Sequence, residues 1–121
     1  MDWKEFQELA RKVMSDYFGS NLTERNPPGI PKKFDFVSGD GRIVGDAKYL
    51  TLVGGEKLPP AKFMEIAGHV WLLEKVSADN RFLVFGNQRR VAEWWLEKYG
   101  LLAGDVDFYF LEDSGKLEKL K

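Results

Sequence analysis

The stretch KKFDFVSGDGRIVGDAKYL, residues 32–50, places two short apolar runs on either side of Gly-Asp-Gly. Both runs alternate with the period of a strand, and the turn residues between them predict a β-hairpin with strands over 33–38 and 42–50. Each strand nevertheless carries an aspartate in its middle, Asp35 or Asp46, and the second strand also carries Lys48. Three charges inside a hairpin need an explanation beyond solubility.

The turn decides which residues of the hairpin face each other. The pair Asp40-Gly41 is favoured in two-residue type I′ turns, and such a turn places Asp35 directly opposite Asp46. Opposed Cβ atoms are about 4.5–5.5 Å apart, and Lys48 shares the face of Asp46 because the two residues are two positions apart. A three-residue loop with a bulge would place Asp35 opposite Gly45 instead, so the prediction depends on an even loop length.

Two opposed carboxylates repel each other unless a cation lies between them. Mg²⁺ prefers oxygen ligands and is usually held by one or two carboxylates together with water and substrate phosphate. A lysine beside such a site can orient a water molecule or neutralise developing charge. The hairpin therefore predicts a site for metal-assisted hydrolysis of a phosphodiester bond.

The rest of the chain predicts one α/β domain over residues 1–121, with a central mixed sheet flanked by helices. The expected order is α-β-β-α-β-α-β. Apolar spacing and breaker residues predict helices over 2–18, 60–76 and 88–99 and strands over 81–86 and 105–112. A further short strand is possible near Leu22, and we expect the C-terminal segment SGKLEKLK to be a frayed tail.

The composition limits the classes of function. Hydrophobic residues make up 44% of the 121 residues, which is enough for one core, and the absence of cysteine excludes disulfides and thiolate zinc sites. We expect a cytoplasmic protein without membrane contact, because neither a signal peptide nor a transmembrane run is visible. The net charge of −1 means that any nucleic-acid surface would be a local patch.

The hairpin residues resemble those of a known nuclease family. Phe34-Asp35, a short glycine-containing turn and then IVGDAK resemble the PD-(D/E)xK superfamily, which has the restriction-endonuclease-like fold. Asp35 matches the aspartate of the first half-motif, with Phe34 where proline is common, and residues 46–48 match D-x-K. The leading helix, the hairpin and the following helix and strand have the family's order over most of the chain.

The resemblance implies a Mg²⁺-dependent nuclease, with Mn²⁺ able to replace Mg²⁺. It implies that Asp35, Asp46 and the backbone carbonyl of Ala47 hold the metal and that Lys48 helps to activate water, which would leave 5′-phosphate and 3′-hydroxyl ends. Family members often add a glutamate from the first helix. The candidates are Glu5 and Glu8, and we prefer Glu5 because Glu8 lies nearly opposite the apolar stripe of that helix.

The expected substrate is DNA rather than RNA, in repair, restriction or junction processing. A homodimer would let so small a chain cut a duplex. The glycine-rich stretch 53–57 lacks P-loop spacing and is expected to be a loop beside the site, with Lys57 near the substrate. The residues expected to contact nucleic acid are Lys33, Lys62, Gln88, Arg89 and Arg90.

Some alternatives stay open at this point. His69, the only histidine, shares a helix face with Lys62 and Glu65 and is either a group at the edge of the site or an ordinary boundary residue. Trp95 is expected in the core, whereas Trp94 is expected at the surface, at a dimer contact or a base-stacking platform. The alternative function is a catalytically silent module of the same fold that binds nucleic acid or a protein partner.

Overall fold

The computed structural model describes residues 1–52 and 60–121, and the described part forms one six-stranded sheet with three α-helices. The helices are α1 (Trp3–Phe18), α2 (Pro60–Lys75) and α3 (Arg89–Tyr99), which continues into the 3₁₀ turn η1 (Gly100–Leu102). The strands are β1 (Leu22–Arg25), β2 (Phe34–Ser38), β3 (Ile43–Leu50), β4 (Asn80–Asn87), β5 (Asp107–Leu111) and β6 (Leu117–Lys119). None of the helices in these ranges is long and apolar enough to cross a bilayer.

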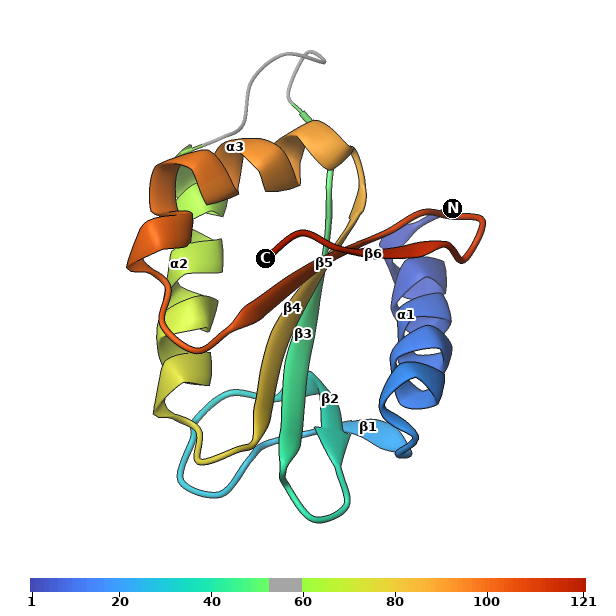
Figure 1. Ribbon diagram of the computed structural model, residues 1–121, viewed down its shortest axis with the longest axis vertical. Helices are drawn as coiled ribbons and strands as arrows, with labels where there is room; N and C mark the ends of the chain where they lie inside the picture. The colour runs from blue at the N-terminus through green and yellow to red at the C-terminus, as the bar shows by residue number, and fades with distance from the viewer. Residues whose placement is uncertain (53–59) are drawn as a thin grey trace.

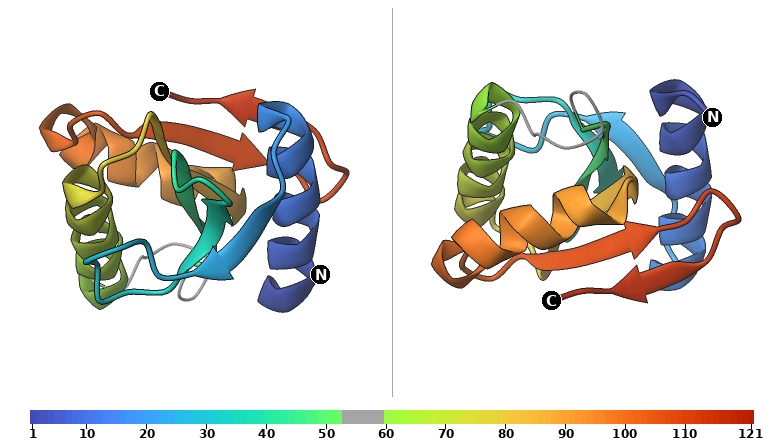
Figure 2. Two further views of the ribbon diagram at one scale, coloured as in Figure 1. Left: turned by 90° about the horizontal axis from the view of Figure 1, so that it is seen from below. Right: turned by 90° about the horizontal axis from the view of Figure 1, so that it is seen from above.

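The sheet is mixed and its strands lie in sequence order, from β1 to β6. The pairs β3–β4 and β4–β5 are parallel, and the other three pairs are antiparallel. Parallel neighbours need a crossover, and the helices α2 and α3 supply the two crossovers. Helix α1 covers the opposite face of the sheet, as Figures 1 and 2 show. A separate apolar core lies on each face.

The predicted single α/β domain and its mixed, helix-flanked sheet are confirmed, with two more strands than the seven-element order contains. One of them is β1, the possible strand near Leu22. The prediction of a frayed C-terminal tail is wrong, because β6 pairs with β5 through Leu111↔Leu117 and Tyr109↔Lys119. Three residues give too little pattern to predict a strand, and β6 is stabilised by its place at the edge of an existing sheet.

Helix α1 begins and ends where its capping residues predict. Asp2 and Glu5 form a reciprocal capping box, and Gly19 closes the helix with a φ of 63°. The spacing of Trp3, Phe6, Ala10, Val13 and Tyr17 predicts one apolar stripe on this helix. The prediction is wrong at the two ends, because Trp3 and Tyr17 are more than half exposed. The buried residues are Phe6, Ala10 and Met14. They are four positions apart on one face of the helix, and the partly buried Leu9, Val13 and Phe18 add to the contact with this core.

Two glycines let aromatic rings lie directly on the central strands. A Cβ at Gly86 in β4 would overlap the ring of Phe6 from α1, and a Cβ at Gly45 in β3 would overlap the ring of Phe82. Because the Phe6 ring packs directly on the backbone of β4, the first turns of α1 lie close to the sheet. The adjacent residue, Gln7, is thereby brought within reach of the hairpin.

The hairpin has the predicted register but not the predicted turn. The pairs Phe36↔Gly45 and Val37↔Val44 have the predicted register, and the next step of this register sets Asp35 opposite Asp46. The type I′ turn at Asp40-Gly41 is wrong, because φ is positive at Gly41 but not at Asp40. Instead Gly41 N donates to Ser38 O at 3.0 Å, and Asp40 accepts the hydroxyl of Ser38 at 2.7 Å. The resulting loop, residues 39–42, is longer than expected but still even, so the parity is preserved.

Candidate active site on the central hairpin

Asp35 and Asp46 lie between the two strands that carry them. Asp35 N donates to Asp46 Oδ1 at 3.2 Å, and Ala47 N donates to Asp35 Oδ2 at 2.9 Å. In a regular sheet these backbone N–H groups would donate to carbonyl groups of the neighbouring strand. Here they donate to side-chain carboxyl groups. The two carboxyl groups are therefore brought together by the backbone of the hairpin itself, as the register predicts.

The outer oxygen of Asp46 is surrounded by basic groups. Asp46 Oδ2 lies 3.3 Å from Lys32 Nζ, 3.5 Å from Lys48 Nζ and 3.4 Å from His69 Nδ1, while the Asp46 side chain is only 3% exposed. Lys48 Nζ also hydrogen-bonds to His69 Nδ1. The site thus combines a buried carboxylate with two ammonium groups and an imidazole.

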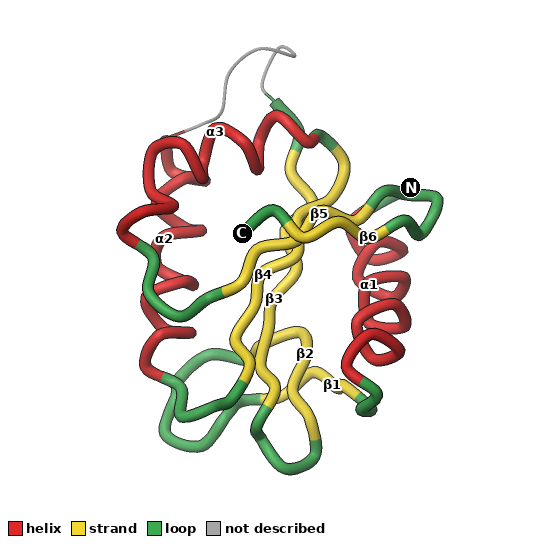
Figure 3. The backbone as a smooth tube through the Cα atoms, viewed as in Figure 1, coloured by secondary structure: helices red, strands yellow, loops and turns green. Residues whose placement is uncertain are grey.

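These three basic groups come from three different parts of the fold. Lys48 is two residues after Asp46 on β3, on the face that α2 covers, and His69 lies in the middle of α2. Lys32 belongs to the connection between β1 and β2, residues 26–33. Figures 2 and 3 show this connection crossing toward α2, and Ile30 within it packs against the core on that side. Lys32 therefore approaches Asp46 from outside the sheet.

The residue of α1 that reaches the site is Gln7, whose Nε2 donates to Asp35 Oδ1. This differs from the expected glutamates. The Glu5 carboxylate accepts the N–H of Asp2 at 3.1 Å in the capping box, and Glu8 is exposed. Only carboxylates were considered in the sequence, and Gln7 lies between the two candidates. The helical position next to the buried Phe6 is the signal that could have identified it.

The paired carboxyl groups have opposite pKa shifts. Burial, the hydrogen bond with Asp46 and its negative charge raise the pKa of Asp35 to about 7, against the smaller effects of the Ala47 N–H and Gln7. Burial alone would also raise the pKa of Asp46. Hydrogen bonds with His69 and Asp35 and the charges of the two lysines hold the pKa of Asp46 well below its usual range instead. Asp46 is thus the permanent anion of the pair, and Asp35 exchanges a proton near neutrality.

Lys48 is unusual for a lysine because it is almost fully buried. Burial lowers the pKa of Lys48 below its ordinary value, although the negative charges of Asp46 and Glu65 oppose this effect. A lysine in this setting loses its proton more readily than a surface lysine. Proton exchange with a neighbouring water molecule is therefore chemistry that this side chain can perform.

The residues present fit a Mg²⁺ or Mn²⁺ ion. Two carboxyl groups share one small volume, and their oxygen atoms are the type of ligand that Mg²⁺ prefers. Across residues 1–52 and 60–121, no group of three or more acidic, histidine or cysteine side chains is arranged to hold a metal. Mg²⁺ does not need such a cage, because it keeps several waters and uses one or two carboxylates with substrate phosphate.

The residues expected to contact nucleic acid are not all free to do so. Lys33 and Lys62 are exposed, and Lys62 pairs with Glu65 at 3.5 Å. Arg89 makes ion pairs with Glu93 and Glu118. Lys57 lies outside the described residues.

Two further candidates lie at the start of α3. The Gln88 side chain accepts the N–H of Leu52 at 2.8 Å and so ties the start of α3 to the end of β3. Arg90 is exposed, with its guanidinium carbon 4.6 Å from the ring centre of the half-buried Trp94. Trp95 is buried as expected and donates to Phe63 O at 3.2 Å. Arg90 and Trp94 thus form a small cationic and aromatic patch at the start of α3.

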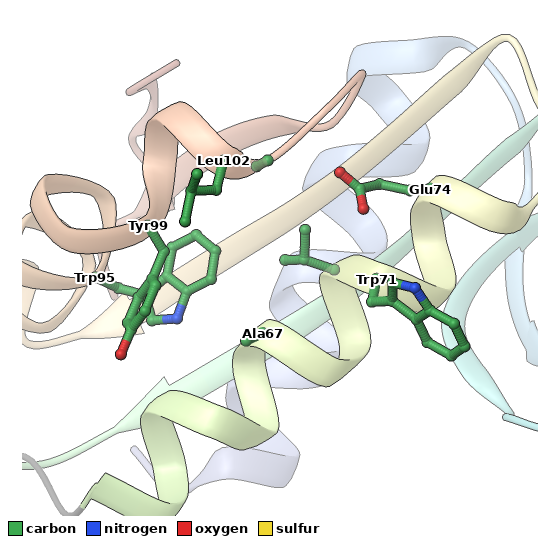
Figure 4. Close-up of a pocket in the computed structure, with 8 residues that line it drawn as sticks. Ala67, Trp71, Glu74, Trp95, Tyr99 and Leu102 are labelled. Carbon is green, nitrogen blue, oxygen red and sulfur yellow. The ribbon is translucent and has the colours of Figure 1, made fainter.

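An apolar slot of about 130 Å³ lies elsewhere, between α2, α3 and η1 (Figure 4). Its lining from α2 includes Val70, Trp71 and Glu74. Helical spacing puts these residues on the far side of α2 from His69 and Glu65. The slot is therefore separate from the aspartate pair and takes no part in the chemistry described above.

No protein family, no curated protein and no solved structure matches this chain. The geometry of the hairpin site is therefore the guide to function.

Proposed function

We propose that this protein is a Mg²⁺-dependent nuclease that hydrolyses phosphodiester bonds in DNA. The observation that carries the proposal is the meeting of Asp35, Asp46 and Lys48 at one point of the hairpin, with two carboxyl groups in contact and a buried lysine beside them. A carboxylate pair with an adjacent lysine is what metal-assisted attack of water on a phosphorus atom requires.

The proposal includes membership of the PD-(D/E)xK superfamily and its restriction-endonuclease-like fold. Support comes from the order of elements around the motif: α1, the hairpin of β2 and β3, then α2 and the parallel strand β4. The position of α1 also supports it, because this helix contributes a side chain to the site through Gln7.

The roles of the residues follow from their positions. Asp35, Asp46 and the carbonyl of Ala47 would hold Mg²⁺, and Mn²⁺ would serve in its place. The ion would polarise the phosphate and lower the pKa of water at the site. Lys48 orients the attacking water, takes part in its deprotonation and neutralises charge that develops on the phosphate. Gln7 fixes the orientation of Asp35 through its hydrogen bond.

We propose DNA rather than RNA as the substrate, contacted by Lys33, Lys62 and Arg90, with a homodimer where both strands of a duplex are cut. Arg89 and Gln88 then act mainly in holding α3 in place, because their side chains are engaged within the protein. The rest of this small surface offers little room for reading sequence, so recognition would depend on backbone and shape.

A catalytically silent nucleic-acid-binding module is the second candidate. It is favoured by one observation, the neutral Gln7 where a third carboxylate would strengthen metal binding. The nuclease is the better-supported function, because keeping two carboxyl groups in contact in a buried site is unfavourable and a silent module gains nothing from it.

A cleavage assay tests the proposal. Wild type and Asp46→Asn would be incubated with Mg²⁺ and linear duplex, branched duplex, single-stranded DNA and RNA. Asp79→Asn is the matched control, because Asp79 is a surface aspartate whose side chain is 66% exposed. We expect wild type and the control to cut at least one DNA, and Asp46→Asn to lose about 100-fold or more. Equal cutting by Asp46→Asn would refute the assigned site, and metal binding without any cutting would favour the silent module.

A further inference from the structure

Asp46 Oδ2 has more positive partners than one carboxylate oxygen needs. The ammonium groups of Lys32 and Lys48 lie 3.3 and 3.5 Å from it, and the His69 ring adds a third contact at 3.4 Å. Two full positive charges therefore face one buried carboxylate. One of these lysines is in excess for neutralising Asp46, and its presence needs a separate explanation.

Lys32 is the less tightly held of the two lysines, although its ammonium also lies 5.0 Å from the centre of the Phe34 ring. Lys48 is fixed by its position in the middle of β3 and by its hydrogen bond to His69. Lys32 belongs to an irregular connection, its side chain is 19% exposed against 10% for Lys48, and its ammonium also touches Lys33 O at 3.3 Å. A lysine side chain has a flexible chain of four carbons, so the ammonium of Lys32 can move by several ångströms without unfolding a helix or strand.

The formal charges at the site indicate where Lys32 would go. Asp35 and Asp46 contribute −2, Lys32 and Lys48 contribute +2, and Gln7 is neutral. Glu65 also acts on Lys48 but is paired with Lys62, so these six charged side chains sum to zero when all are ionised. A divalent cation added to this group leaves a net charge of +2. Such a site holds a divalent cation weakly until an anion with oxygen ligands, such as a phosphodiester, enters with it.

We propose that Lys32 couples the binding of the metal to the binding of substrate phosphate. In the metal-free protein Lys32 neutralises Asp46. When a divalent cation takes the oxygen of Asp46, the ammonium of Lys32 turns to a non-bridging oxygen of the entering phosphodiester. Metal and DNA then bind cooperatively, and the protein holds little metal when DNA is absent. This inference rests on the proposed function of the hairpin site.

Two binding measurements on Lys32→Met at pH 8 test the coupling without measuring cleavage. The first is calorimetric titration of Mn²⁺ into the protein without DNA. The second is fluorescence anisotropy of a short labelled DNA duplex with Ca²⁺ or with EDTA. Lys116→Met is the matched control, because it makes the same charge change at an exposed position after β5. Thermal unfolding checks that each variant is folded, and Lys32→Gln is the second variant should Lys32→Met fail to fold.

We expect Lys32→Met to bind Mn²⁺ about tenfold more tightly than wild type, because its competitor for Asp46 is gone. Ca²⁺ should raise the DNA affinity of wild type, and this increase should be about tenfold smaller in Lys32→Met. The control should match wild type in both measurements. Unchanged or weaker Mn²⁺ binding by Lys32→Met would overturn the coupling while leaving the nuclease proposal intact, provided wild type binds Mn²⁺ and Asp46→Asn does not. Failure of wild type to bind Mn²⁺ even in the presence of the DNA duplex would overturn both.

Discussion

Asp35 and Asp46 are joined across the hairpin, because Asp46 accepts the backbone N–H of Asp35 while Asp35 accepts the N–H of the residue that follows Asp46. This reciprocal arrangement holds one oxygen of each carboxyl group from within the hairpin, and Gln7 of α1 donates to the other oxygen of Asp35. It also forces a division of charge, because two buried carboxyl groups in contact cannot both ionise easily. Asp46 is surrounded by basic groups and remains ionised, so the contact raises the pKa of Asp35 instead.

The shifted pKa of Asp35 predicts how stability depends on pH. The folded pKa of about 7 lies above the ordinary value of 3.8, so between these values the folded protein binds more protons than the unfolded chain. The free energy of unfolding contributed by Asp35 therefore falls as pH rises from about 4 to about 7. Thermal unfolding of the metal-free protein across this window should show the decline in wild type and not in Asp35→Asn. Parallel curves for the two proteins would contradict the assignment.

The same titration predicts the pH dependence of metal binding. An ionised Asp35 is the form that binds a cation, so Mn²⁺ affinity should rise as pH increases through about 7 and level off above it. Calorimetric titrations at several pH values measure this directly. An affinity that is constant from pH 5 to pH 8 would be inconsistent with Asp35 as a ligand.

Gln7 should control the affinity of the site for a metal. The hydrogen bond from Gln7 lowers the pKa of Asp35, so Gln7→Ala should weaken Mn²⁺ binding by about tenfold, as loss of a ligand's supporting partner does. Gln7→Glu supplies a third carboxylate and should strengthen Mn²⁺ binding instead. Lys12→Ala, an exposed change on the same helix, is the control and should behave as wild type. Identical affinities for both Gln7 variants would separate Gln7 from the site.

Removing the charge of Asp46 should also destabilise the metal-free protein. Asp46→Asn leaves Lys32 and Lys48 beside a neutral amide in a buried place, which we expect to reduce the free energy of unfolding by about 1–3 kcal/mol. Asp79→Asn at the surface should change it by less than about 0.5 kcal/mol. Urea unfolding without divalent ions measures both values. A more stable Asp46→Asn would mean that repulsion between the aspartates outweighs the ion pairs.

The close packing of α1 against β4 depends on Gly86. A Cβ at this position meets the ring of Phe6, so Gly86→Ala should cost about 1–3 kcal/mol by overpacking. Gly68 in α2 has open space around it, and Gly68→Ala should stabilise the helix by about 0.5–1 kcal/mol. Because Gln7 follows Phe6, Gly86→Ala should also weaken Mn²⁺ binding, whereas Gly68→Ala should not. Urea unfolding and calorimetry of the two variants check this pair of outcomes.

Local sequence patterns were sufficient to predict the register of the hairpin. They were insufficient to predict which residues of other elements contact it. The period of two and the predicted turn placed Asp35 opposite Asp46 even though the turn type was wrong, because the observed loop 39–42 has the same centre as the predicted two-residue turn. Gln7 was missed because the sequence does not show how closely α1 approaches β4, which depends on Phe6 packing over Gly86. The position of Lys32 depends on the path of an irregular loop, for which no periodic pattern exists.

His69 shows what a helix pattern can and cannot decide. Its face on α2 was predictable from spacing, and the structure resolves the open alternative in favour of a group at the edge of the site. The contact with Asp46 required the relative placement of α2 and β3, which is a property of the whole fold. The polar contacts that complete the site were therefore the least predictable part of it.

The measurement that most directly tests the central claim is calorimetric titration of Mn²⁺ at pH 8 into wild type and Asp46→Asn, in the presence of a short DNA duplex. We expect saturable binding of Mn²⁺ by wild type and a loss of about 100-fold or more in Asp46→Asn, with both proteins folded. Equal binding by the two proteins, or no binding by either, would contradict the claim that the hairpin carboxyl groups form a metal site.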